Sequence, residues 1–379
     1  MTSSAAERGA AATDEDGGGG RAHDRPAADG TGTHGDTASP TAARHRGVVL
    51  GLVVLVLLVG VVALGVGRYS VGVDQVVRIL LGQVLPIERT WSDAEAAAVL
   101  NVRLPRVLLS MLVGAGLAVC GAVLQAVFGN PIVSPQILGV SSGASFGGAL
   151  AIVLGLGSAA LVLGAFMFGL VALVAVFAVS RVRGPAPPLT IVLSGIVVGA
   201  FFSALVSLLT YLADPYSDLP SIVFWLLGSL AAADATRVAV VGVPVLAGGA
   251  LFLALRWRIN VLSLGDEDAA TLGLRPGRLR WLLLAAVAAV VAGAVAVSGV
   301  IGWVGLVVPH LARLWVGSDH RAVIPVSLLL GAAYLTVIDT VTRNLGVAEI
   351  PLGVLTALIG APVFLALLHG SRRRMWADA

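Results

Sequence analysis

Apolar residues run through this chain in long blocks that short polar connections separate. From residue 107 to residue 180 the chain contains no charged side chain. That run is more than three times the roughly 20 residues that a helix needs to cross a bilayer. Clusters of Gly, Pro and Ser interrupt it, and such residues mark turns and close contacts between helices. The pattern predicts a chain that crosses a membrane repeatedly.

Windows without charge, read between turn signals, predict about ten transmembrane helices, so the expected fold is an all-α, polytopic integral membrane protein. A further apolar stretch at 219–233 is too short to cross and is expected to be interfacial or re-entrant. The expected spans are 48–67, 107–127, 137–156, 159–180, 189–212, 238–255, 281–304, a short one at 308–316, then 322–340 and 351–370.

The first 46 residues differ from the rest. They are rich in Gly, Ala, Thr and Asp and show no apolar periodicity, which predicts a disordered cytoplasmic tail at 1–46. Residues 47–379 then form one membrane domain.

Arginine placement predicts the orientation of that domain. All 24 basic residues are arginines. If the tail is cytoplasmic, 14 of them lie on the cytoplasmic side of the expected spans and seven on the outer side, and the remaining three lie in the tail. The positive-inside rule therefore places both termini in the cytoplasm and the protein in the cell membrane.

Composition excludes several classes of function. Hydrophobic residues make up 58% of the chain and charged residues 12%, against about a quarter charged in soluble domains. The arginines are scattered and form no basic face, so nucleic acid is not an expected partner. Cys120 is the single cysteine, which excludes disulfides and thiolate metal sites.

A weak internal repeat is visible at an offset of 178 residues. In the expected topology the two matching regions run in opposite directions, so the repeat would be inverted, an arrangement common in transporters. The coinciding pairs are Gly121/Gly299, Pro131/Pro309 and Gly139/Gly317.

Three stretches resemble the signatures of one family. The first is Arg103-Leu-Pro-Arg106 with Leu138-Gly-Val-Ser-Ser-Gly-Ala144, the second Gly302-Trp-Val-Gly-Leu-Val-Val-Pro-His310, and the third Glu349-Ile-Pro-Leu-Gly353. Together they resemble the FecCD-type permeases, which are membrane subunits of ATP-driven importers for iron-siderophores, haem and cobalamin. The resemblance covers roughly residues 48 to 372.

Arginines at the outer side are candidate docking residues. Arg103 and Arg106 lie three positions apart on one helical face, and Pro105 can begin the regular helix. Two guanidinium groups facing outward could grip carboxylates of a soluble partner, or could simply anchor the helix at the interface. The resemblance implies that they and Arg343 dock glutamates of an extracytoplasmic binding protein. Asp339, four residues before Arg343, competes as an intrahelical partner.

A cytoplasmic loop at 256–280 carries a short segment with an acidic first turn and an apolar side. The resemblance implies that it is the coupling helix that meets the ATPase subunit, whereas an ordinary capped loop helix is the alternative. The expected coupling residues are Leu264, Gly265, Asp266, Glu267, Ala269, Leu272 and Gly273.

Uncharged polar residues in apolar surroundings are candidates for the translocation path. They could line a wet path or bond neighbouring helices to one another. The candidates are Gln125, Asn130, Ser141 and Ser142.

Metal binding and catalysis are not expected of this chain. His310 follows Pro309 and has no second ligand near it in sequence, so a structural role is favoured over a metal or proton-relay role. Without a lysine the chain cannot form a nucleotide-binding P-loop. It is therefore not expected to be an enzyme or to bind a cofactor, and partner subunits would hydrolyse the ATP.

The resulting expectation is a permease subunit that carries iron(III)-siderophore complexes, embedded in lipid. Its expected partners are cytosolic ATP-binding subunits, a substrate-binding protein and a second permease copy or paralogue. Haem or cobalamin import on the same scaffold is the alternative, and a gradient-driven secondary transporter is a less favoured one because no convincing acid lies in mid-membrane.

Overall fold

Helices account for every regular element among the described residues, which in this computed structural model are 40–67, 69–181, 187–346 and 348–377. The tail expected at 1–46 lies outside these residues up to position 39. Its last part is helical, because helix α1 begins at Pro40 and runs to Gly65. Proline suits this first position, where its fixed φ is helical and no N–H is needed.

Among the elements of the described residues, eight are long helices and the others are short. The long ones are α1, α4 (Leu104–Val127), α6 (Gly157–Ser180), α7 (Pro188–Leu212), α9 (Ala235–Leu262), α11 (Pro276–Ser298), α13 (His320–Thr342) and α14 (Leu352–Ala377). The short ones are α2 (Val73–Leu81), α3 (Asp93–Ala97), α5 (Val140–Val153), α8 (Asp218–Leu226), α10 (Asp266–Thr271) and α12 (Val304–Val316), with a π-helical turn at Ala98–Arg103 and a 3₁₀ turn at Pro135–Leu138.

Seven helices within the described residues are long and apolar enough to cross a membrane, and three shorter apolar helices accompany them. Each of the ten expected spans coincides with one of these helices. However, α5 has 14 residues and α12 has 13, fewer than the roughly 17 that a full crossing needs. The membrane fold is confirmed, whereas the count of ten crossings stays a prediction. Helix α8, which overlaps the stretch 219–233 expected to be interfacial, has nine residues.

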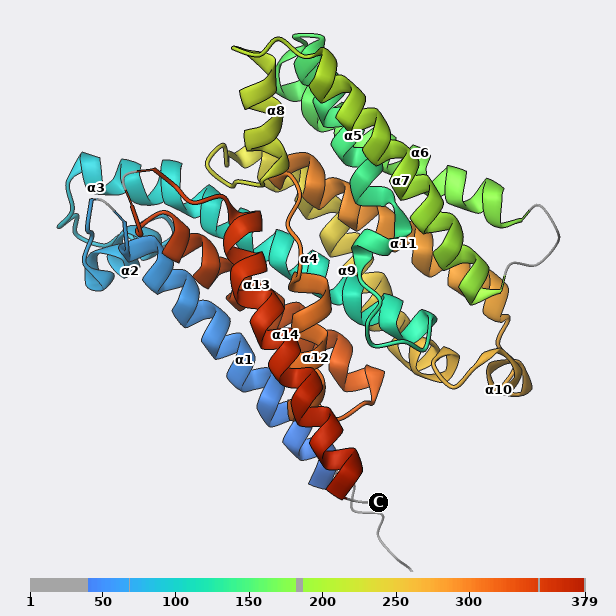
Figure 1. Ribbon diagram of the computed structural model, residues 1–379. Coiled ribbons are helices and arrows are strands. Elements are labelled where there is room, and N and C mark those ends of the chain that lie inside the picture. Colours follow the sequence, from blue (N-terminus) through green and yellow to red (C-terminus); the bar gives the residue numbers. More distant parts are fainter. Residues whose placement is uncertain (1–39, 68, 182–186, 347, 378–379) are drawn as a thin grey trace, which may run out of the picture. The chain divides into compact units, whose positions relative to one another are not determined.

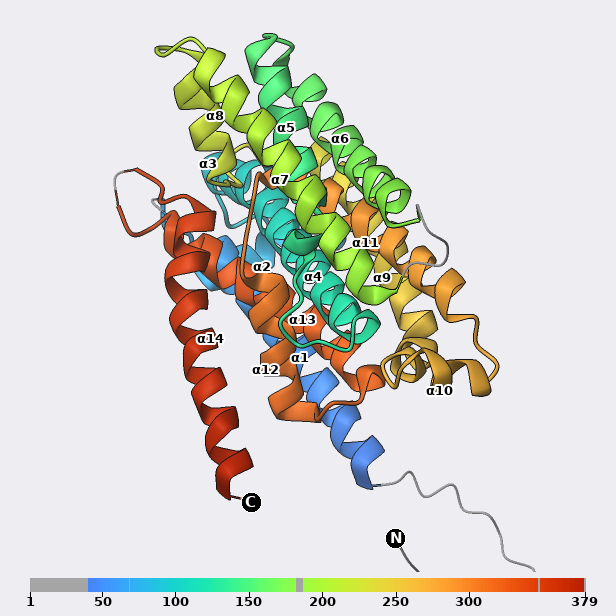
Figure 2. The same ribbon diagram turned by 45° about the vertical axis from the view of Figure 1, so that its right-hand side comes forward.

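The two ends of the helix bundle carry different elements (Figures 1 and 2). Helix α10 lies at the end where α1 begins and α14 finishes, while α3 and α8 lie towards the opposite end. The short acidic helix and both described chain ends therefore share one side of the bundle, as the arginine count predicts.

Glycines let the central helix α4 pack directly against its neighbours. A Cβ at Gly121 would lie 1.8 Å from the carbonyl oxygen of Gly305 on α12, and one at Gly114 would lie 2.2 Å from that of Gly331 on α13. Only glycine fits at either position, so the backbones of the two helices are in direct contact, as in other pairs of membrane helices.

The glycine pairs of the proposed internal repeat do not agree with one another. Gly121 lies in the middle of α4, whereas Gly299 ends α11 with a φ of 68°. At this pair the offset of 178 residues aligns positions with different backbone conformations, whereas Gly139 and Gly317 both have a positive φ, 72° and 76°. The inverted repeat stays a prediction.

Candidate functional site

The helix that carries the first two candidate arginines has a break in its hydrogen-bond pattern. Helix α3, the π turn Ala98–Arg103 and α4 form one continuous helical rod. Pro105 has no N–H to donate to the preceding turn, and its ring would crowd the carbonyl of Asn101. A wider turn just before the proline relieves both problems, and such turns occur often at functional sites. It places Arg103 at the last position of the π turn.

Arg103 faces the end of α1. Its Nη1 donates to the carbonyl oxygens of Leu64 at 2.7 Å and Gly65 at 3.0 Å, and its Nη2 donates to the carbonyl of Tyr69. The last carbonyls of a helix have no partner within the helix. Arg103 supplies that partner for α1.

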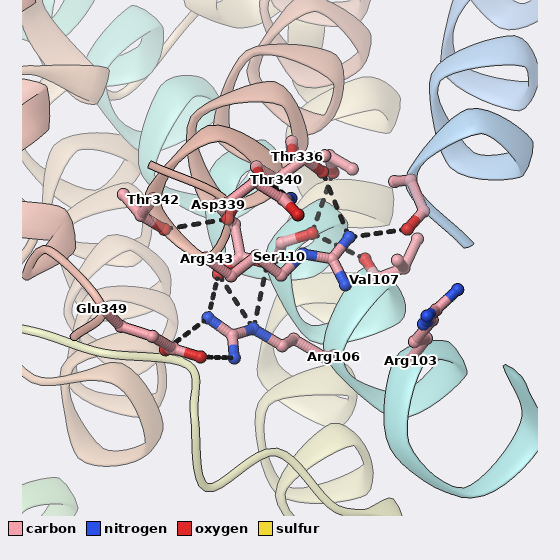
Figure 3. Close-up of polar contacts among 12 residues, drawn as sticks. Arg103, Arg106, Val107, Ser110, Thr336, Asp339, Thr340, Thr342, Arg343 and Glu349 are labelled. Atoms are coloured by element: carbon pink, nitrogen blue, oxygen red, sulfur yellow. Dashed lines mark hydrogen bonds and ion pairs between the residues drawn. The ribbon is translucent and has the colours of Figure 1, made fainter. Parts of the chain in front are cut away.

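Arg106 faces two carboxylates that lie far away in the sequence (Figure 3). Its Nε and Nη2 donate to Asp339 Oδ1 on α13 at 3.0 and 2.9 Å, and its Nη1 and Nη2 donate to the two oxygens of Glu349 at 2.9 Å each. Paired hydrogen bonds to a planar guanidinium are the strongest ion-pair geometry available to arginine. Arg106 therefore ties α4 to α13 and to the segment that leads into α14.

Arg343 also bonds within the protein. Its Nη2 donates to the carbonyl oxygen of Ala63 at 2.6 Å and to Thr340 Oγ1 at 3.3 Å. Its Nε lies 3.8 Å from Asp339 Oδ2, so the expected intrahelical pair is confirmed. Arg106 is nevertheless the closer partner of Asp339, at 2.9 Å.

These contacts correct one expectation about the arginines. Arg103, Arg106 and Arg343 are only 6%, 8% and 8% exposed, so their guanidinium groups do not project outward. They instead line a cavity of about 520 Å³ together with Tyr69 and Glu349. Three arginines against the carboxylates of Asp339 and Glu349 leave one net positive charge there. The arrangement can attract an anionic partner, and the docking role itself stays a prediction.

At the opposite end, α10 has the features expected of a short docking helix. Gly265 precedes it with a φ of 118°, which a residue with a side chain rarely adopts. Ala269 is buried against the protein, whereas Leu264 and Leu272 are 61% and 54% exposed. Exposed leucines beside an acidic first turn offer an apolar surface to a protein outside the membrane.

Arg280 on α11 anchors this helix, and the sequence analysis missed it. The side chain is only 3% exposed, and its Nη2 and Nη1 donate to the two carboxylate oxygens of Asp266 at 2.5 and 3.2 Å. Asp266 is the first residue of α10. The sequence offered one signal for this contact. Arg280 directly precedes the apolar span expected at 281–304, and the acidic start of a short helix lies at Asp266 in the same loop.

Gln125 bonds helices together. It is buried, its Nε2 donates to the carbonyl of Val133 at 3.3 Å, and its Oε1 accepts from Arg313 Nη1 at 2.6 Å. These contacts fasten the end of α4 to α12. They favour a role in bonding neighbouring helices over a role in lining a wet path.

The other path candidates lie in different surroundings. Asn130 is exposed, accepts from the N–H of Ile132 at 2.9 Å and lines a cavity of about 430 Å³ beside the start of α7. Ser142 on α5 accepts from Ser203 Oγ on α7 at 3.3 Å. Ser141 is buried near Trp303. Their place in a translocation path stays a prediction.

His310 packs against an aromatic ring. Its ring centroid lies 6.3 Å from that of Phe364 on α14, in an edge-to-face arrangement. Within the part of the chain that the structure describes, no group of three His, Cys, Asp or Glu side chains could hold a metal ion.

Comparisons with known proteins agree with this architecture. The model of the FecCD transport family matches residues 54–370. The molybdate import system permease protein MolB of Haemophilus influenzae is 43% identical over 326 residues, which cover 86% of this chain and 96% of the relative. The probable iron chelatin transport system permease protein of Helicobacter pylori is 42% identical over 274 residues, covering 72% and 83%. A solved structure, described as an inward-facing conformation of a metal-chelate type ABC transporter, has 41% identity and a TM-score of 0.77, covering 86% and 99%.

The all-helical membrane fold and these relatives define the protein as a permease of an ABC importer. The chain belongs to the FecCD transport family. A permease of this class works with ATP-binding subunits and a substrate-binding protein, so the gradient-driven alternative is set aside.

Proposed function

We propose that this chain is the permease subunit of an ATP-driven importer for iron(III)-siderophore complexes. The observation that carries the importer assignment is the family match over residues 54–370, joined to the short helix α10, which two exposed leucines, Leu264 and Leu272, flank at one end of the bundle. The iron chelate rests on the family resemblance and on a relative whose name describes iron chelatin transport.

The proposed mechanism assigns a task to each end of the bundle. A substrate-binding protein approaches the positively charged cavity around Arg103, Arg106 and Arg343. Cytosolic ATPase subunits meet α10, and movement driven by ATP passes through Arg280 into α11. Two permease copies, or this chain with a paralogue, enclose the path between them. In this scheme the cytoplasm lies on the α10 side.

The test is uptake by cells that lack this gene. Labelled ferric siderophores, haem, cobalamin and molybdate are supplied in turn, and the wild-type gene is returned as the rescue. The proposal predicts loss of ferric-siderophore uptake and its recovery on rescue. Unchanged uptake of every ferric siderophore, in cells without a paralogue, contradicts the substrate assignment, and loss of haem or cobalamin uptake alone selects the alternative on the same scaffold.

Molybdate is a second candidate substrate. The molybdate permease matches this chain over 96% of its own length, a more complete match than that of the iron chelatin relative. Loss of molybdate uptake with ferric-siderophore uptake intact selects this candidate.

A further inference from the structure

A groove between α6 and α9 shares no lining residue with the cavities described above. Both helices pack on α11 and make few contacts with each other. At the floor, Gly293 of α11 leaves room for its neighbours, because a Cβ there would lie 2.9 Å from Pro244 Cγ and 3.9 Å from Phe166 Cε2. The groove has a volume of about 610 Å³.

The lining changes from polar to apolar along the groove. At the starts of α6 and α9 it is formed by Ser158, Asp234, Thr236 and Arg237, and one to two turns further along by Val162, Phe166, Val240 and Pro244. Helix α9 finishes next to α10, so its start and the polar mouth lie at the opposite side of the bundle. A phospholipid has the same sequence of chemistries, from a charged headgroup to an apolar chain.

The outer rim of the groove faces the hydrocarbon. Leu163 and Val243 belong to candidate membrane spans and are largely exposed. Exposed large apolar side chains at this depth are stable against lipid tails and not against water. The groove is therefore open to the bilayer, and a lipid can enter it sideways.

The mouth carries a cation that suits a phosphate. Arg237 Nε lies 4.0 Å from Asp234 Oδ2, which is a long ion pair, and about a fifth of its side chain is exposed. Asp234 is already used by the helix, since its Oδ1 accepts from the N–H of Arg237 at 2.7 Å as the N-cap of α9. Arginine side chains near helix ends reach toward headgroups in this way.

We propose that this groove is a phospholipid site, with one acyl chain between α6 and α9 and the headgroup phosphate on Arg237, in the leaflet opposite α10. The site lies on α6 and α9, away from the charged cavity and from α10, so it is independent of the substrate proposed above.

The test counts lipids that stay bound to the purified transporter. The complex is loaded from phosphatidylglycerol vesicles, extracted in mild detergent and weighed by native mass spectrometry. Ala159→Trp fills the groove from its exposed α6 wall, and Ala178→Trp is the matched control because Ala178 is exposed on the other half of α6. We expect the wild type and Ala178→Trp to retain a phospholipid that Ala159→Trp loses.

Arg237 variants test the headgroup contact. Arg237→Glu is expected to lower phosphatidylglycerol retention severalfold, and Arg237→Lys is expected to lower it much less. Retention of diacylglycerol, which has no phosphate, is expected to be weak and equal in the wild type and both Arg237 variants. Equal phospholipid retention by Ala159→Trp and Ala178→Trp overturns the proposal. Diacylglycerol held as tightly as phospholipid overturns the phosphate contact, and an oligomer lost only in Ala159→Trp assigns the groove to a second protein copy instead.

Discussion

Arg106 on α4 and Asp339 on α13 are 233 residues apart in the sequence, and their side chains form an ion pair at 2.9 Å within the protein interior. Asp339 is 1% exposed. The pair therefore fixes two central helices to each other, and Glu349 on the other side of the guanidinium adds the segment before α14.

Replacing Arg106 is expected to destabilise the permease strongly. In Arg106→Gln the carboxylate of Asp339 stays buried without its main partner, and breaking a buried pair in this way costs about 3–5 kcal/mol. Unfolding of the purified protein in detergent, followed by circular dichroism, measures the loss. As a control, Arg89→Gln removes the exposed pair with Asp93, for which about 0–1 kcal/mol is expected. Equal stability of the two variants contradicts the clamp.

Removing the charge of Glu349 is expected to speed association with the substrate-binding protein. In Glu349→Gln the net charge around the cavity rises from one to two, and an added charge at the rim of an interface acts mainly on the association rate. Binding kinetics at low and high salt check this, with a larger gain at low salt. Slower association at low salt argues that the cavity does not receive an anionic partner.

Arg280→Gln is expected to uncouple ATP hydrolysis from uptake. Without the bond to Asp266, the exposed leucines that flank α10 remain, but the helix loses its fixed position on α11. ATPase activity and uptake by the reconstituted complex are compared, with Arg278→Gln as the control because Arg278 is exposed. Uptake per ATP that equals that of the control shows that Arg280 does not transmit the movement.

Local patterns in the sequence predict the helices well. Hydropathy finds each of the ten apolar helices in the described part of the chain, because a helix that lies in a bilayer must carry apolar side chains. The pairing of Asp339 with Arg343 follows from their spacing of four residues. The start of α1 at Pro40 was missed, since a helix that extends beyond its apolar part carries no hydropathy signal.

Contacts between distant segments are beyond such patterns. Helical spacing places Arg103 and Arg106 near one face. In the structure, however, Arg103 ends the π turn and donates to carbonyls at the end of α1, whereas Arg106 donates to Asp339 on α13. Only the packing of α1, α4 and α13 brings these partners within reach.

The most direct test of the account is uptake into proteoliposomes that contain this permease, its ATPase and its binding protein, with labelled ferric siderophore on one side and ATP on the side of α10. The account predicts uptake that requires both ATP and the binding protein and that is abolished by Leu272→Asp, which places a charge on the exposed surface beside α10, but not by Leu85→Asp, an exposed leucine remote from α10. Uptake driven by an ion gradient without ATP, or unaffected by Leu272→Asp, would contradict it.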